Sequence, residues 1–327
     1  MGDVKLEGAY QNVEGWMFAD LSSCSVFTLD ATTLQSAEVL FSTSVKGGVT
    51  SNNESTTSVA FDVNEGVLYA SAIVSGKQTI KMGATVEEKE FAMTADGLVE
   101  YATIVGAINV ADKSVKASKV YTNSTSNLNK DEVAKVVVDG DKVYVGGVAH
   151  SALSFDNTKE IKGHGDLYLA SLKVADLAVN WTTLSGKEEG TGTDNGEVFV
   201  GMGVFGQGLY LIGYTEALNT HAPIVGVNGY VSMADGAYDA VQEDVYSAFT
   251  TNGTLMGGAS YTIAENVANI TYFVSKSETS AITSIEAEKN EAVKYYNLQG
   301  VEVASDDLET GLYICKQGNK AVKVLVK

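Results

Sequence analysis

The sequence predicts an all-β protein, a β-propeller of about five four-stranded blades followed by a small C-terminal β-sandwich. Three observations support this class. Helical periodicity is nearly absent, short apolar runs rich in Val, Thr and Tyr alternate with Gly, Asn and Asp, and these runs recur as paired hairpins. Tandem β-sandwiches are the alternative, because short, evenly spaced strands fit that architecture too.

The first type of hairpin is a strand, a tight turn and a second strand. Its turns contain Gly or Asn, which tolerate positive φ. The copies cover residues 59–74, 133–150 and 198–215, with a weaker copy at 259–275, and the first three turns contain Gly66, Gly140 and Gly206.

A second type of hairpin lies between these copies. It begins with an apolar strand, turns at an Asp, and continues into a strand that carries an aromatic residue. The copies begin at Ser25, Glu90, Asp166 and Gly229, their turns lie at Asp30, Asp96, Asp176 and Asp235, and the aromatic residues are Phe41, Tyr101, Trp181 and Phe249.

One hairpin of each type gives a four-stranded unit that recurs about every 65–75 residues, longer than a common blade. A single sheet cannot bury both of its faces, so radial stacking is favoured. Residues 8–23 are the expected first hairpin. The segments "VYVGG" (143–147), "LYLIGYT" (209–215) and "WTTLSG" (181–186) resemble bacterial β-propeller repeats.

The charge of the chain limits its partners. Its net charge is −19, and none of its 22 basic residues is Arg. Such a surface repels nucleic acid and anionic lipid, so neither is expected as a partner. No apolar run is long enough to span a bilayer. The two cysteines, Cys24 and Cys315, are interpreted as small buried apolar residues.

The C-terminal part differs from the rest. We expect a repeat domain over 1–278, a polar linker over 279–292 and a β module over 293–327. This module resembles the C-terminal sorting domain of the type IX (Por) secretion system of Bacteroidetes, through "YNLQG", "GLYI" and the final "KAVKVLVK". The matching positions are Tyr296, Asn297, Gly300, Gly311, Tyr313, Gly318, Lys320 and Lys323.

That resemblance implies a secreted protein or one at the outer cell surface, with the secretion machinery as a partner of the module. An ordinary accessory β-domain is the alternative. The opening "MGDVKLEG" lacks the apolar core of a signal peptide, which fits a cytosolic protein or a mature chain, and the C-terminal motifs favour the mature chain.

Long connections, among them residues 75–89, 108–132, 150–165 and 185–197, are expected on one face of the propeller, and binding residues favour such loops. Their Asn, Asp and Glu side chains could bind a hydroxylated ligand or Ca²⁺, or act as an acid–base pair in glycoside hydrolysis. No cofactor is otherwise predicted. The candidates are Asn52, Asn53, Glu54, Asp156, Glu188, Glu189, Asp194, Asn195 and Glu197.

The three histidines, His150, His164 and His221, fall in these connections and are weak candidates for a shared metal site, because their spacing matches no metal motif. No nucleophile elbow, P-loop or dinucleotide fingerprint is present, so no catalytic residue is predicted. The leading hypothesis is a non-enzymatic binding or adhesion protein for an extracellular glycan or protein. The alternatives are a polysaccharide lyase or glycoside hydrolase on the same scaffold, and a structural surface component.

Overall fold

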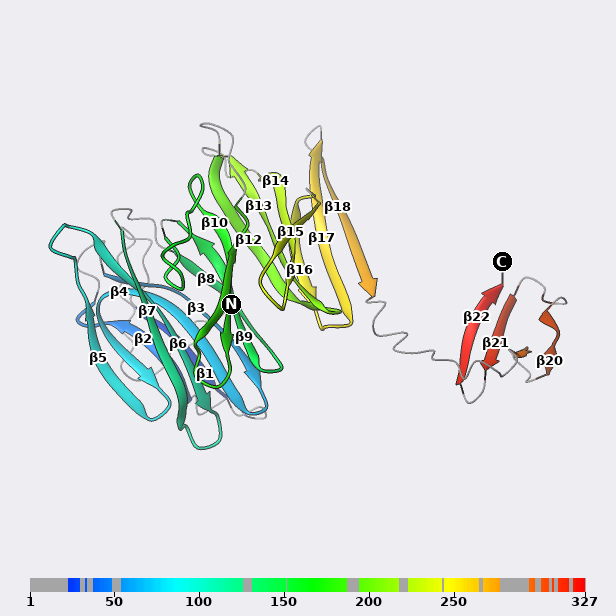
Figure 1. Ribbon diagram of the computed structural model, residues 1–327, viewed down its shortest axis with the longest axis horizontal. Helices are drawn as coiled ribbons and strands as arrows, with labels where there is room; N and C mark the ends of the chain where they lie inside the picture. The colour runs from blue at the N-terminus through cyan, green and yellow to red at the C-terminus, as the bar shows by residue number, and fades with distance from the viewer. Residues whose placement is uncertain are drawn as a thin grey trace. The chain divides into compact units, whose positions relative to one another are not determined.

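The computed structural model describes residues 23–29, 33, 38–48, 54–125, 131–150, 152–186, 194–217, 223–242, 244–264, 267–276, 294–297, 301–305, 308, 311–317 and 320–326. Regular structure in these ranges is β-strand, and none of them contains a helix that could cross a membrane. The all-β prediction is therefore confirmed. The chain divides into two compact units, Met1–Lys276 and Ser277–Lys327 (Figure 1).

The first sheet has seven strands because its longest strand, β4, belongs to two four-stranded arrangements. The first half of β4 pairs with β3 and β6, and its second half pairs with β2 and β5. The change of partners falls at Gly76, whose φ is 75°. The strands are β1 (Ser23–Thr28), β2 (Glu38–Val45), β3 (Ser55–Asn64), β4 (Val67–Met82), β5 (Thr85–Phe91), β6 (Val99–Asn109) and β7 (Val115–Thr125).

Three further sheets follow, each an antiparallel meander with its strands in chain order. The second sheet contains β8 (Glu132–Asp139), β9 (Lys142–Ala149), β10 (Asp166–Lys173) and β11 (Val179–Leu184). The third contains β12 (Asp194–Phe205), β13 (Gly208–Ala217), β14 (Pro223–Ser232) and β15 (Tyr238–Gln242). The fourth has three described strands, β16 (Tyr246–Thr251), β17 (Leu255–Ala264) and β18 (Val267–Lys276).

The sheets of the first unit stack through the first strand of each four-stranded arrangement, which in the first sheet is β3. Strand β3 contacts β8, β8 contacts β12, and β12 contacts β16 (Figure 1). A radial array requires this neighbour relation. Within the described ranges, the first and last sheets of the series share no extensive strand contact of the kind that would close a ring.

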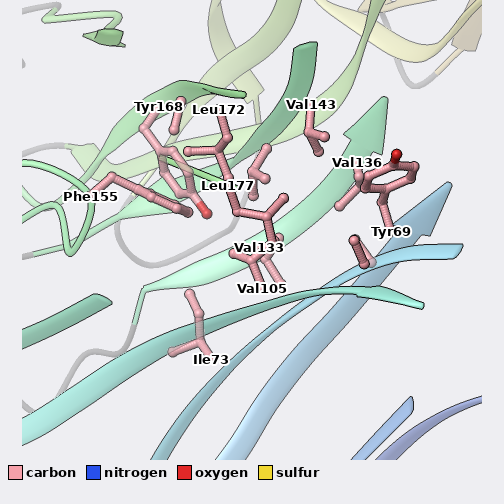
Figure 2. Close-up of a cluster of buried hydrophobic side chains, with 14 of the residues drawn as sticks. Tyr69, Ile73, Val105, Val133, Val136, Val143, Phe155, Tyr168, Leu172 and Leu177 are labelled. Carbon is pink, nitrogen blue, oxygen red and sulfur yellow. The ribbon is translucent and has the colours of Figure 1, made fainter. Parts of the chain in front are cut away.

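The core lies between consecutive sheets, and the second sheet is buried on both faces. Figure 2 shows Tyr69 and Ile73 of β4 meeting Val133 and Val136 of β8 on one side of that sheet. A separate cluster on its other side joins it to the third sheet. Its members include Tyr144, Leu167, Leu169, Met202 and Leu211.

The hairpins of the first type form as predicted. Residues 59–74, 133–150 and 198–215 lie in β3–β4, β8–β9 and β12–β13. Their turns use positive φ, at 75° for Gly66, 57° for Gly140 and 65° for Gly206. Residues 259–275 also form a hairpin, β17–β18. The predicted hairpin at residues 8–23 lies almost wholly outside the described residues.

Other local predictions were wrong. Strands β5 and β6 do not form the hairpin expected from Glu90, because both pair with β4 instead. Residues 75–89 and 108–132, expected as long loops, contain most of β5, the second half of β4, and β7. Phe249 does not end the hairpin that begins at Gly229, since it lies in β16, the first strand of the next sheet.

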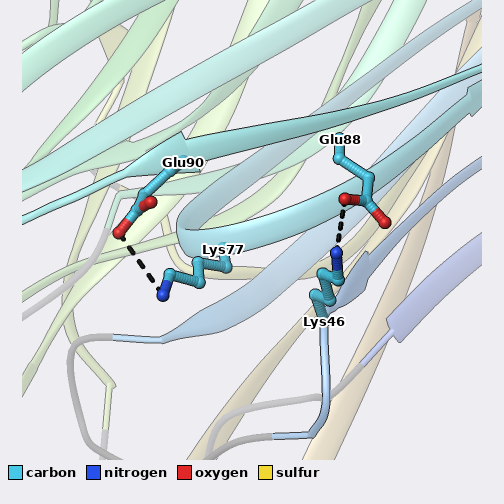
Figure 3. A network of polar contacts seen from close by, with 4 residues as sticks. All are labelled: Lys46, Lys77, Glu88 and Glu90. Atoms are coloured by element: carbon cyan, nitrogen blue, oxygen red, sulfur yellow. Dashed lines mark hydrogen bonds and ion pairs between the residues drawn. The ribbon is translucent and has the colours of Figure 1, made fainter.

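Strand β5 is an exposed edge with charged side chains. Its Glu90 pairs with Lys77 of β4 at 3.8 Å, and its Glu88 pairs with Lys46, which follows β2 (Figure 3). Exposed ion pairs of this kind contribute about 0–1 kcal/mol each. Their main effect is to make the edge a poor template for pairing with another chain.

The second unit contains one described sheet, where a small sandwich was predicted. Its strands are β19 (Lys294–Tyr296), β20 (Glu302–Val303), β21 (Gly311–Gln317) and β22 (Lys320–Val326), in the order β20-β19-β21-β22. Asn297 closes the turn to β20, because its side-chain oxygen accepts the Val301 N–H at 2.9 Å.

The two cysteines differ in their surroundings. Cys24 on β1 is buried, as predicted, and burial raises the pKa of its thiol to about 11. Cys315 on β21 is only partly buried.

Candidate functional site

A cleft of about 530 Å³ lies along the first strands of successive sheets, and we call it the first-strand cleft. It is lined by β8, β12 and β16, together with Asp62 of β3. Its charged residues are Asp62, Lys135 and Asp139, and its aromatic residues are Phe199 and Phe249. Sites for small ligands commonly measure about 300–1,000 Å³, so the cleft is large enough for one.

Side chains hold the strands of this cleft in place at one end. The Asp62 carboxylate accepts the N–H groups of Val138 and Val63, each at 2.8 Å, which ties β3 to β8. The Thr251 hydroxyl donates to the Val204 carbonyl at 2.8 Å and ties β16 to β12. The walls are therefore fixed by bonds between sheets, as a preformed site requires.

A second cleft, of about 510 Å³, lies between the third and fourth sheets, and we call it the aromatic cleft. Tyr210 of β13 lines one side, and Phe249 of β16 and Phe273 of β18 line the other, with Tyr246 at the start of β16. Polar and apolar residues complete the lining. The polar ones are Asn228, Asp244, Ser260, Thr271 and Ser275, and the apolar ones are Ile212, Val241 and Met256.

Ring contacts orient the walls of the aromatic cleft. Tyr210 and Tyr230 are cross-strand neighbours with ring centroids 5.6 Å apart, and Tyr246 and Phe273 have theirs 5.1 Å apart. Gly208 makes room for the Tyr230 ring, since a Cβ at this position would lie 1.7 Å from a ring atom. The aromatic walls are thus set by pairing within each sheet.

The polar groups of the aromatic cleft are held as well. The Asn228 side chain is buried, and its amide donates to the Asp244 carbonyl oxygen at 2.8 Å. Burial, and then the nearby Asp244 carboxylate, raise the pKa of Tyr246 above its ordinary value. Tyr246 therefore stays neutral at physiological pH.

Two buried carboxylates meet near the starts of β10 in the second sheet and β12 in the third. Glu197 is 4% exposed and accepts the Leu167 N–H at 2.7 Å and the Ser185 hydroxyl. Asp166, fully buried, accepts the Lys162 N–H at 2.8 Å and lies 3.5 Å from the same hydroxyl. Both carboxylates bond backbone N–H groups, which is a structural arrangement.

The predicted binding residues are dispersed. Glu54 precedes β3, and Asp194, Asn195 and Glu197 lie in β12, where a loop was expected. The Asp156 carboxylate accepts bonds from Thr158 and Thr182, and the Thr158 bonds contribute most to lowering its pKa. Asn52, Asn53, Glu188 and Glu189 lie outside the described residues.

The histidines are only partly described. The Nδ1 of His150 donates to the backbone carbonyl oxygen of His164 at 2.8 Å, so the contact joins a ring to the backbone and not two rings. His221 lies outside the described residues. Within the described ranges no group of three His, Cys, Asp or Glu side chains is placed to hold a metal ion.

The residues of the second-unit motif are placed as follows. Tyr296 lies in β19 and Asn297 follows it, Gly311 and Tyr313 lie in β21, and Lys320 and Lys323 lie in β22. Gly300 and Gly318 are outside the described residues.

The sequence did not indicate the aromatic cleft. Tyr210 and Tyr230 are cross-strand neighbours, but this can be seen only once β13 and β14 are paired.

No protein-family model matches the chain, and no curated protein matches it. Among solved structures, the chain is similar to a GH43 β-1,3-galactosidase at 9% identity and a TM-score of 0.26, over 82% of this chain and 68% of that one. A likeness at this level carries no argument about function.

Proposed function

We propose that this chain is a secreted or cell-surface protein whose first unit binds an extracellular glycan or protein without chemical conversion. The observation that carries the proposal is the first-strand cleft, in which strands of consecutive sheets present Asp62, Lys135 and Phe199 to one space. Converging strands hold such residues rigidly, which favours recognition.

The hydrolase alternative gains no support from the pair of buried carboxylates, Asp166 and Glu197. A glycosidase needs two carboxyl groups facing each other across a substrate cleft, about 5–9.5 Å apart. Asp166 and Glu197 come close together, but both are buried and bond backbone N–H groups.

The first unit, in this proposal, closes into a propeller, and the long connections near its binding surface add contacts to the partner. Exposed apolar side chains at the two ends of the series support closure, with Phe27 on β1 at 37% exposure and Tyr272 on β18 at 76%. Stacked sheets pack about 10 Å apart.

Spin labels at these positions, in a Cys315→Ser background, should then give a short, narrow distance distribution. A long or broad distribution contradicts closure.

The second unit serves, in this proposal, as the sorting signal for type IX secretion. No cofactor is proposed, and Ca²⁺ is the candidate cation for the polar residues of the first unit. The proposal is supported by the motif positions on β19, β21 and β22. Export should stop when residues 293–327 are deleted and continue when residues 187–193 are replaced.

Binding is tested with a glycan array and with immobilised extracellular proteins, using the full chain. Lys135→Ala and Asp62→Asn should each weaken binding, whereas Glu87→Ala, an exposed change on β5, should not. Absence of any glycan or protein ligand would contradict the proposal and favour the structural alternative.

A further inference from the structure

We infer that the aromatic cleft, a site separate from the first-strand cleft, binds a neutral oligosaccharide; this rests on the proposed function only in taking an extracellular glycan as a ligand of the first unit. The cleft offers flat rings from both neighbouring sheets, which suit the C–H faces of a sugar ring. It also offers an amide, a carboxylate and hydroxyls, which suit the sugar's hydroxyl groups. An uncharged polyhydroxylated ligand matches both features.

The charge of the lining selects against acidic glycans. Asp244 contributes a carboxylate, and the described residues that line the cleft include no Lys. The whole chain has a net charge of −19 and lacks Arg. A sulfated or uronate sugar would therefore meet repulsion with no cation to offset it.

The cleft also differs from the contact between the second and third sheets. The second and third sheets pack through large apolar side chains such as Leu167, Leu211 and Met202, as close-packed interiors do. Between the third and fourth sheets, small polar side chains at Ser260, Thr271 and Ser275 stand at the corresponding surface and leave about 510 Å³. The remaining walls are aromatic or apolar, with Ile212, Val241 and Met256 among them. A mostly apolar space with a few polar groups is typical of a small-ligand site.

Strand β18 supplies a matched pair of positions for the test. Thr271 lines the cleft, and Phe273 on the same face does so too. Tyr272 lies between them on the opposite face and is 76% exposed. Thr271→Trp fills the cleft without removing a core side chain, and Tyr272→Ala changes the other face of the same strand.

The experiment is a glycan array with the full chain, followed by calorimetric titration of the best neutral oligosaccharide. Thr271→Trp and Tyr210→Ala should weaken binding by about tenfold or more, as loss of a central contact does. Tyr272→Ala should bind as the unchanged protein does. Circular dichroism and the melting temperature establish that each variant is folded, and added ligand should raise the melting temperature of the unchanged protein.

The contrary results show whether the assigned site, the ligand class or the proposed function is wrong. If neutral oligosaccharides bind equally well to folded Thr271→Trp, the assigned site is wrong and the proposed function stands. If only sulfated or uronate glycans bind, or only proteins bind, the ligand class is wrong and the proposed function again stands. If neither glycans nor proteins bind, both proposals fail.

Discussion

Glu197 joins three segments of the first unit through one carboxylate group. Its side chain accepts bonds from Leu167 on β10 and from Ser185 after β11, while it lies itself on β12. The backbone N–H of Glu197 also donates to the Gly165 carbonyl at 3.3 Å. Removing the carboxylate leaves a buried N–H without its acceptor, which is a costly defect.

We therefore expect Glu197→Ala to lower the free energy of unfolding by about 1–3 kcal/mol, as measured by urea denaturation. Glu197→Gln retains an oxygen that can accept the Leu167 bond and should cost less. Equal stability of the alanine variant and the unchanged protein would show that this link does not support the fold.

A second residue, Tyr144, predicts a response to alkaline pH. Burial, followed by Asp139 and Asp141, raises the pKa of its hydroxyl to about 12. The unfolded chain loses this proton near pH 10, whereas the folded protein keeps it until about pH 12. The stability that this group contributes is thus complete below pH 10 and is lost as pH rises towards 12.

Tyr144→Phe should remove this part of the alkaline loss, up to about 2–3 kcal/mol between pH 10 and 12. At pH 7 the Tyr144→Phe substitution should leave the free energy of unfolding unchanged or raise it slightly, because the Tyr144 hydroxyl has no hydrogen-bond partner within the described residues. Denaturation curves at several pH values measure both effects. An unchanged pH profile for Tyr144→Phe would contradict the assignment.

The candidate site could be predicted only in part from single residues. The sequence singled out Glu197 as a polar residue of interest, but its burial depends on Leu167 and Ser185, which are distant in sequence. Tyr210 and Phe273 look like ordinary strand residues until the third and fourth sheets are placed face to face. Pairing between sheets is not encoded in any local pattern.

Among the elements, hairpin turns were the most predictable. Gly66 and Gly140 allow backbone conformations that the turn requires, and that requirement is local. Strand β7, in contrast, was read as a loop, because an exposed outer strand with Lys116, Lys119 and Asn123 has the composition of a loop. Only its bonds to β6 make it a strand.

The change of partners along β4 gives a prediction at this scale. Gly76 has a φ of 75°, and a Cβ there would lie 2.6 Å from Cγ of Glu54. Gly66 has the same φ with no atom within 4 Å of such a Cβ. Gly66→Ala should thus lower the free energy of unfolding by about 1 kcal/mol through backbone strain alone.

Gly76→Ala should cost about 1–3 kcal/mol more than Gly66→Ala, because of the added steric conflict with Glu54. The difference between the two variants in urea denaturation isolates the packing contribution. If the two variants lose the same stability, Glu54 moves aside without cost and the close approach is unimportant.

For the whole molecule, the division into two compact units predicts independent folding of the first. Residues 1–276 contain the described hydrophobic clusters of the stacked sheets. A chain that ends at residue 276 should melt within about 2–4 °C of the same transition in the full chain, which corresponds to less than about 1 kcal/mol. Differential scanning calorimetry of both chains measures this, and a large downward shift would show that the second unit stabilises the first.

The double membership of β4 also affects how the first unit opens. One continuous backbone from Val67 to Met82 supplies bonds to strands on both sides of the change of partners. Amide protons in the two halves should therefore exchange with solvent deuterium at related rates, since releasing one half loosens the anchor of the other. The seven strands would then behave as one cooperative block during local unfolding.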